Sequence, residues 1–96
     1  MATTTRTPSL AQQAARAHDG HHRVLSRLAA GQPAIPAGER DVRALSTAIG
    51  TLVGWGAVSS TRVVHEEIRG AGRYEYRYEI TEAGRALLDR LAGRFA

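Results

Sequence analysis

The sequence predicts an α+β fold in which helices lead into a two-stranded β-hairpin and a closing helix. Three observations support this prediction. Apolar residues recur at helical spacing through Glu39–Trp55. Aromatic or apolar residues alternate strictly with charged ones from Tyr74 to Ile80, which is the period of a strand. Glycines at positions 70 and 72, between that strand and an earlier valine-containing segment, suit a hairpin turn.

The length and composition indicate one small domain. The chain has 96 residues. Residues 1–8 are rich in threonine and predict a disordered arm, so the domain itself is expected to span residues 9–96. No apolar run is long enough to cross a membrane, and the first residues lack the apolar core of a signal peptide. Because the chain has no cysteine, we expect neither disulfides nor thiolate metal sites, which fits a cytoplasmic protein. No cofactor is expected.

Two short helices are expected in the first third of the chain. Ser9 can cap a helix over Leu10–Ala17, whose alanines favour helix. The dipeptide at 19–20, Asp-Gly, predicts a break or a kink. A second helix over about His21–Ala30 would place its apolar residues on one face. The prolines at 33 and 36 then favour extended chain.

The longest expected helix covers Glu39–Trp55, and Gly56 would end it. Its buried stripe should consist of Val42, Leu45, Ile49, Leu52 and Val53. The opposite face should carry Arg40, Arg43, Thr47, Gly50, Thr51 and Gly54. Two glycines inside a helix each lower its stability by about 1 kcal/mol relative to alanine, so another role for them is of interest.

A hairpin of strands Val58–Arg69 and Arg73–Ile80 is expected next. Its tyrosines and Ile80 share one face, while the other carries alternating arginine and glutamate, so Arg77 should pair with a glutamate. Thr81 is the expected N-cap of the closing helix. That helix carries four large apolar residues on one side: Leu87, Leu88, Leu91 and Phe95.

Two segments of the chain resemble a known pattern. Residues 52–58 read LVGWGAV, and residues 78–85 read YEITEAGR. A helix ending in the first segment, then a hairpin, then the second segment resembles the winged-helix transcriptional regulators of bacteria, of the MarR-like and PadR-like families. The resemblance covers roughly Val42–Leu91. It implies a winged-helix fold, which is a helix-turn-helix with a two-stranded β-wing and a closing helix, and binding of double-stranded DNA.

The resemblance also implies where DNA would lie. Residues 39–55 would form the recognition helix in the major groove, and the wing, residues 58–80, would lie on the backbone or in the minor groove. Arginine can bind guanine through two hydrogen bonds, and threonine can contact thymine methyls or phosphates. The expected DNA-binding residues are Arg40, Arg43, Thr47 and Thr51 on the helix, with Arg69 and Arg73 beside the wing turn.

The segment before the recognition helix departs from the family pattern, because Gly31–Arg40 is too short and proline-rich for a full helix. Two assignments remain open. In one, His21–Ala30 is the first helix and a turn near Pro36–Asp41 replaces the second. In the other, Leu10–Ala17 is the first helix and His21–Ala30 the second.

The charge pattern keeps a second function open. The net charge of +4 comes from arginine without lysine and suits an anionic partner. However, residues 39–58 and residues 59–80 each contain as many acidic as basic side chains. We therefore expect a small transcriptional repressor or regulator that binds specific DNA sequences, with a winged-helix protein–protein interaction module as the alternative.

Metal binding and catalysis are not expected. His18, Asp19, His21 and His22 are clustered, but neighbouring residues on a helix point about 100° apart, which suits surface histidines better than one metal site. The sequence has neither Gly-x-Ser-x-Gly nor a phosphate-binding loop ending in Gly-Lys, so we expect no enzyme activity. Trp55 and the tyrosines are expected in the core and the hairpin rather than in a ligand site.

A homodimer is expected because a small core gains stability from burying an apolar helix face on a second copy. The closing helix is the first candidate for this contact, through Leu91 and Phe95. The helix over Leu10–Ala17 is the second, through Leu10 and Ala14.

Overall fold

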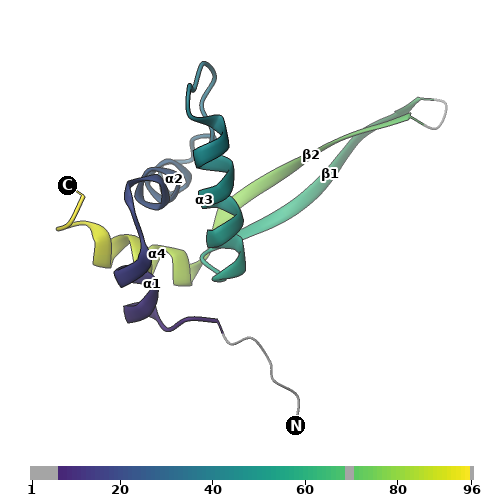
Figure 1. Cartoon of the computed structure of the whole chain (residues 1–96). Helices are drawn as coiled ribbons and strands as arrows, with labels where there is room; N and C mark the ends of the chain where they lie inside the picture. Colours follow the sequence, from purple (N-terminus) through teal and green to yellow (C-terminus); the bar gives the residue numbers. More distant parts are fainter. Residues whose placement is uncertain (1–6, 69–70, 96) are drawn as a thin grey trace, which may run out of the picture.

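The computed structural model describes residues 7–68 and 71–95, and the side chains of all of these except 64–68 and 71–74. This part of the chain forms an α+β fold of four helices and one two-stranded antiparallel sheet (Figure 1). The elements are α1 (Leu10–Arg16), α2 (Asp19–Ala29), α3 (Val42–Gly54), β1 (Val58–Ile68), β2 (Ala71–Ile80) and α4 (Glu82–Leu91). The helices gather into one body, and the hairpin projects away from it.

A break separates the first two helices as expected, but it lies at Ala17 and His18, whose backbone is extended, rather than at residues 19–20, which belong to α2. Ser9 caps α1 as expected, because its side chain accepts from the amide of Gln12 and the Gln12 side chain accepts in return from the amide of Ser9. His18 acts as the N-cap of α2, since its Nδ1 accepts from the amide of Gly20 at 3.2 Å.

Helix α3 begins at Val42, three residues later than expected, because residues 31–41 form an ordered connection that leads up to it. Within this connection the amide of Glu39 donates to the carbonyl of Pro36, which makes the turn that one of the two assignments requires. Leu45, Ile49 and Leu52 are buried as predicted, together with Ala48. Val42 was wrongly placed in the buried stripe: it is 47% exposed in the first turn of α3.

The hairpin pairs Val58 with Ile80 at its base and runs in regular register to Val64 and Tyr74, followed by an irregularity before Glu66. The predicted alternation is confirmed near the base of the hairpin, since Tyr78 and Ile80 pack on the core while Glu75, Arg77 and Glu79 are exposed. Tyr76 was expected to pack with the other tyrosines, but it is exposed because it lies farther along β2 from the body. A turn was expected at residues 70–72, but Ala71 and Gly72 belong to β2. Residues 69–70 lie outside the described residues.

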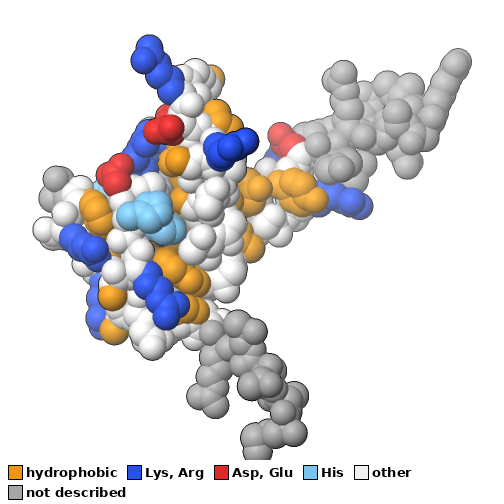
Figure 2. All heavy atoms as spheres, viewed as in Figure 1, with side chains coloured by type: hydrophobic (Ala, Val, Ile, Leu, Met, Phe, Trp, Pro, Cys, Tyr) orange, Lys and Arg blue, Asp and Glu red, His pale blue; other side chains and the backbone are white. Residues whose placement is uncertain are grey.

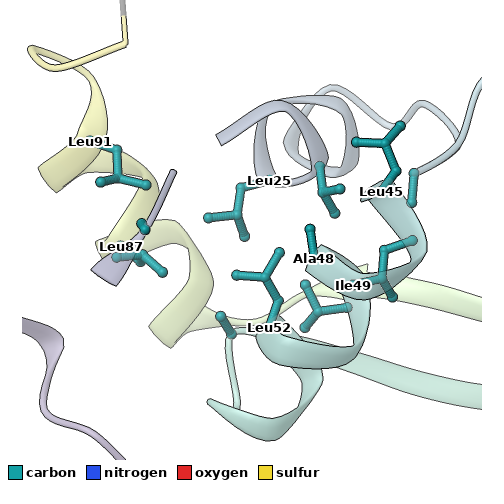
Figure 3. Packing of buried hydrophobic residues seen from close by; sticks show 12 residues of the cluster. Leu25, Leu45, Ala48, Ile49, Leu52, Leu87 and Leu91 are labelled. Atoms are coloured by element: carbon teal, nitrogen blue, oxygen red, sulfur yellow. The ribbon is translucent and has the colours of Figure 1, made fainter. Parts of the chain in front are cut away.

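The core lies between α2, α3 and α4 (Figure 3). Leu25, Leu45, Ala48, Ile49, Leu52, Leu87 and Leu91 supply most of its volume. Burying side chains of this size contributes about 1.5–3 kcal/mol each, so this cluster holds the helices together. No helix in the described part of the chain is both long enough and apolar enough to pass through a membrane.

One hydroxyl joins three elements beneath the hairpin. Thr81 caps α4 as predicted, because its Oγ1 accepts from the amide of Gly84 at 3.0 Å. The same Oγ1 donates to the carbonyl of Gly56 at 2.6 Å, directly after α3. The amide of Thr81 also donates to the carbonyl of Ala57 at 3.0 Å. The end of α3, the base of the hairpin and the start of α4 therefore share one hydrogen-bonded junction.

Candidate nucleic-acid interface

The outward face of α3 is made of small and polar residues. At 3.6 residues per turn, Arg43, Thr47, Gly50 and Gly54 lie within about 60° of one another around the helix axis. All four are exposed, and they lie opposite the buried stripe. Arg40 is also exposed, but it lies in the bend before Val42, so its placement on the helix face was wrong. Arg43 is therefore the arginine that α3 itself presents.

The two threonines of α3 already use their hydroxyl protons. The Oγ1 of Thr47 donates to the carbonyl of Arg43 at 3.0 Å, and the Oγ1 of Thr51 donates to the carbonyl of Thr47 at 3.2 Å. Thr47 is exposed, whereas Thr51 is half-buried. In this arrangement Thr47 presents a methyl group and oxygen lone pairs outward, and Thr51 is the less accessible of the two.

The glycines of α3 are not required by packing within the described chain. A Cβ built on Gly50 or Gly54 would meet no described atom within 4 Å, and neither residue has a positive φ. These glycines therefore do not serve to let another described helix pack closely against α3. Because neither glycine has a side chain, the helix backbone is directly accessible on the outward side of α3.

A groove separates α3 from the hairpin. It has a volume of about 260 Å³. Its walls are lined by Ser46, Ile49, Gly50 and Val53 from α3 and by Ser60, Tyr76 and Tyr78 from the hairpin. Tyr76 is 54% exposed, which makes it the most exposed large apolar side chain described. Figure 2 shows apolar side chains where the hairpin leaves the body beside α3.

A second, larger groove lies between the connection that follows α2 and strand β2. Its volume is about 550 Å³. Consecutive residues 31–35 form one wall, and residues 75–79 form the other, with Leu28 and Ile49 at its floor. Its charged lining residues are Glu75 and Glu79, which are acidic, and Arg77, which is basic. The grooves on the two sides of Tyr76 therefore differ in charge, because no acidic residue lines the groove beside α3.

The exposed charges at the start of α3 are of mixed sign. Asp41 lies between Arg40 and Arg43 in sequence, and all three are exposed. On the face drawn in Figure 2 the arginines stand at separate places. The expected pairing of Arg77 is confirmed, because its Nε lies 3.3 Å from the Oε1 of Glu75. Arg69 lies outside the described residues, and the same holds for the side chain of Arg73.

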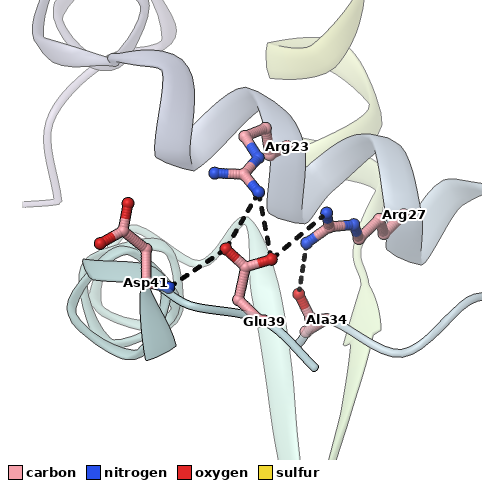
Figure 4. Close-up of polar contacts among 5 residues, drawn as sticks. All are labelled: Arg23, Arg27, Ala34, Glu39 and Asp41. Carbon is pink, nitrogen blue, oxygen red and sulfur yellow. Dashed lines mark hydrogen bonds and ion pairs between the residues drawn. The ribbon is translucent and has the colours of Figure 1, made fainter. Parts of the chain in front are cut away.

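Glu39 fixes the connection that leads into α3 (Figure 4). One nitrogen of Arg23 donates to both carboxylate oxygens of Glu39 at 3.1 and 3.2 Å, and Arg27 lies 4.0 Å from the same carboxylate. Arg27 also donates to the carbonyl of Ala34 at 3.4 Å. The Glu39 carboxylate accepts from the amide of Asp41 as well, at 3.4 Å. Two arginines of α2 are therefore engaged with the connection, and they set where α3 begins.

Replacing Glu39 by alanine should lower the free energy of unfolding by about 1–3 kcal/mol, because it leaves two partly buried guanidinium groups without their carboxylate. Asp41→Ala is the matched control. Asp41 is exposed and makes no side-chain cap hydrogen bond, so its loss should change stability by less than about 0.5 kcal/mol. Urea unfolding of both variants measures this, and equal effects would show that Glu39 does not hold the connection.

The histidine cluster is partly a structural element rather than a set of surface side chains. His21 is 4% exposed, which corrects the expectation for this residue. Its ring stacks on Trp55 at 5.1 Å and lies 4.0 Å from the ring of His18. Its Nδ1 accepts from the amide of His18 at 3.0 Å, and its Nε2 has no hydrogen-bond partner among the described residues. Burial, with a smaller contribution from His18, lowers the pKa of His21 to about 4.

The C-terminal segment folds back onto the body. His22 stacks on Phe95 at 5.4 Å, and Arg94 donates to the carbonyl of Ala14 while lying over the Phe95 ring. Phe95 is thereby half-buried, and Leu91 is completely buried in the core. Leu91 was therefore wrongly expected to be available to a second copy. No group of three residues suited to a metal ion is found among the described residues.

Sequence reasoning missed the groove beside α3, although its residues carry a signal. Tyr76 was expected on the same face of the hairpin as Tyr78, and the register confirms this. Only Tyr78, however, packs on the core. The hairpin extends beyond the body, so only the residues near its base reach the core. Strand length relative to helix length would have indicated that Tyr76 lies beyond the covered region.

No protein-family model, curated protein or solved structure matches the chain.

Proposed function

We propose that this protein binds double-stranded DNA as a winged-helix regulator, with α3 in the major groove and the hairpin as a wing along the backbone. The observation that carries the proposal is the outward face of α3. This face is exposed and carries Arg43 and Thr47. At Gly50 and Gly54 it has no side chains, so the helix backbone itself is accessible. A helix with such a face can approach base edges closely, and arginine is the side chain that most often reads guanine there.

The order of elements supports the same proposal. Helix α2 packs against α3, and the hairpin and α4 follow in the order expected of a winged helix. The turn between Pro36 and Glu39 would replace the missing helix, and the ion pairs of Glu39 would hold α3 at a fixed angle to α2. Regulation of transcription as a homodimer on a two-fold site remains part of the proposal. Phe95, Leu10 and Ala14 are its half-buried candidate contacts.

The proposal is tested by DNA binding to genomic fragments at several salt concentrations. On the tightest fragment, the logarithm of the affinity should fall linearly with the logarithm of salt, with a slope of about −0.9 per phosphate contact. Arg43→Ala should cost roughly 1–3 kcal/mol and relax the preference at one base pair. Absence of binding even at low salt would overturn the proposal.

Arg90→Ala is the matched control for Arg43→Ala. Arg90 is exposed in the last turn of α4, so its loss changes the net charge equally but removes no residue of α3. It should leave the affinity nearly unchanged. If both variants lose the same affinity, Arg43 acts only through overall charge, and α3 is not the element that reads the DNA.

A protein–protein interaction module is the second candidate. It is favoured by the groove beside the connection after α2, which is apolar at its floor, lined by Glu75 and Glu79, and bordered by the exposed Tyr76. Arg77 also lines this groove and is paired with Glu75, so Glu79 is the acidic group that would repel a phosphate backbone but not a protein segment. If no DNA fragment binds, this groove is the first surface to examine.

A further inference from the structure

The groove between α3 and the hairpin is lined by both hydroxyl-bearing and apolar residues, which come from both elements. Four of its lining residues carry a hydroxyl group: Ser46 on α3, and Ser60, Tyr76 and Tyr78 on the hairpin. Its apolar lining is the side chains of Ile49 and Val53 and the ring of the exposed Tyr76. No carboxylate lines it, in contrast to the groove on the other side of β2.

Each of the two elements that form the groove carries one exposed arginine. Arg62 pairs with Tyr76 across the hairpin, so its side chain leaves the sheet on the same face as Tyr76 and Ser60. Arg43 lies on the same side of α3 as Gly50, two turns nearer the start of the helix. Neither arginine is among the residues that line the groove.

We propose that this groove holds one sugar–phosphate strand of duplex DNA, with Tyr76 packed against a deoxyribose. This inference rests on the proposed function and adds to it a specific strand contact. Serine, tyrosine and arginine side chains are the usual partners of phosphate and sugar, which receive half to two-thirds of protein–DNA hydrogen bonds. The hydroxyls of Ser46 and Ser60 donate to phosphate oxygens, and the two arginines supply the opposing charge.

The strand contact links the two elements that approach the duplex. If α3 lies in the major groove, the strand bordering that groove passes between α3 and the hairpin, where Gly50 leaves room for it. Tyr76 then fixes the register of the protein along the DNA without reading a base. Thr61, which lies on the opposite face of β1, plays no part in this contact.

The chain has no cysteine, so a single introduced thiol can report on the groove. Ser60→Cys places the thiol at the groove, and Ser59→Cys places it one residue earlier on the opposite face of the same strand. Both serines are exposed. The experiment measures the rate of maleimide labelling of each full-length variant, with and without the tightest genomic DNA fragment.

At a DNA concentration about ten times the dissociation constant, roughly nine-tenths of the protein is bound, so labelling of the Ser60→Cys variant should slow about tenfold. Labelling of the Ser59→Cys variant should stay nearly the same. Equal slowing of both, or no slowing of either while DNA remains bound, would overturn the strand contact and leave DNA binding intact. No binding by the unmodified protein would overturn both proposals.

Substitution of the tyrosine gives an independent measurement. Tyr76→Ala should weaken DNA binding roughly tenfold, equivalent to about 1.4 kcal/mol, and equally for different sequences, because sugar contacts carry no sequence information. Tyr76→Phe, which keeps the ring, should retain most of the affinity. Thr61→Ala is the control and should bind as the unmodified protein does. Unchanged affinity of Tyr76→Ala would remove Tyr76 from the interface.

Discussion

Replacing Gly84 by alanine should destabilise the protein by about 3 kcal/mol or more. A Cβ at this position would lie 2.0 Å from the carbonyl oxygen of Ala57 and 2.8 Å from Cγ1 of Ile80. The side chain of Ile80 could adjust, but the carbonyl is backbone and is bonded to the amide of Thr81. The first turn of α4 would have to move away from the end of α3, breaking the junction. Denaturant unfolding measures the loss.

Gly50→Ala is the matched control, and its expected effect has the opposite sign. Gly50 is also helical, but a Cβ there meets no described atom within 4 Å. Alanine should therefore raise the free energy of unfolding by about 1 kcal/mol through helix propensity. If both variants are equally stable, α4 does not approach Ala57 as closely as the structure shows.

Acid should remove a large part of the stability through one buried histidine. The pKa of His21 is about 4 in the folded protein, because of burial and of the neighbouring His18, against 6.5 in the unfolded chain. The unfolded chain therefore binds more protons between these values, and stability falls as the pH is lowered from about 6.5 to about 4. The loss at pH 4 amounts to about 3 kcal/mol at most, from 1.36 kcal/mol per pKa unit.

The variant His21→Gln isolates this contribution from the carboxylates that titrate in the same range. Glutamine at the third helical position can still accept from the amide of His18 but does not titrate. Its stability should depend less steeply on pH between about 6.5 and 4. His22→Gln, one residue further on, should keep the steep dependence. Equal pH profiles for His21→Gln and the unmodified protein would exclude His21 as the cause.

Much of the fold could be predicted from the sequence, because local signals decide it. The side-chain caps at Ser9 and Thr81 and the alternation of β2 depend on neighbours a few residues away, and the structure confirms them. The start of α3, in contrast, does not depend on neighbouring residues alone. It depends on Glu39 reaching Arg23 and Arg27 on another helix, and no local pattern reveals such an ion pair. Arg40 was placed on the helix for the same reason.

The candidate site was predicted where it follows from helical spacing and missed where it depends on shape. Arg43 and Thr47 face outward because the buried stripe of α3 leaves them no other direction. The exposure of Tyr76 depends on how far the hairpin extends past the helices, which the alternation of β2 does not reveal by itself. The cap at His18 was missed because histidine is not among the usual capping residues. The role of Gly84 requires knowing that Ala57 lies against it.

The hairpin is attached to the body at its base, so a small rotation at the Thr81 junction would move its far end by a much larger distance. Strand β2 contains ten residues, and an extended strand of that length measures about 33 Å. Its attachment to the body lies at one end, where Thr81 is bonded to Gly56 and Gly84. A rotation of about 5° at this pivot displaces the far end of such a strand by about 3 Å, which is the length of a hydrogen bond. A small rotation of the hairpin relative to α4 would therefore be enough to make or break a hydrogen-bonded contact at the far end of β2.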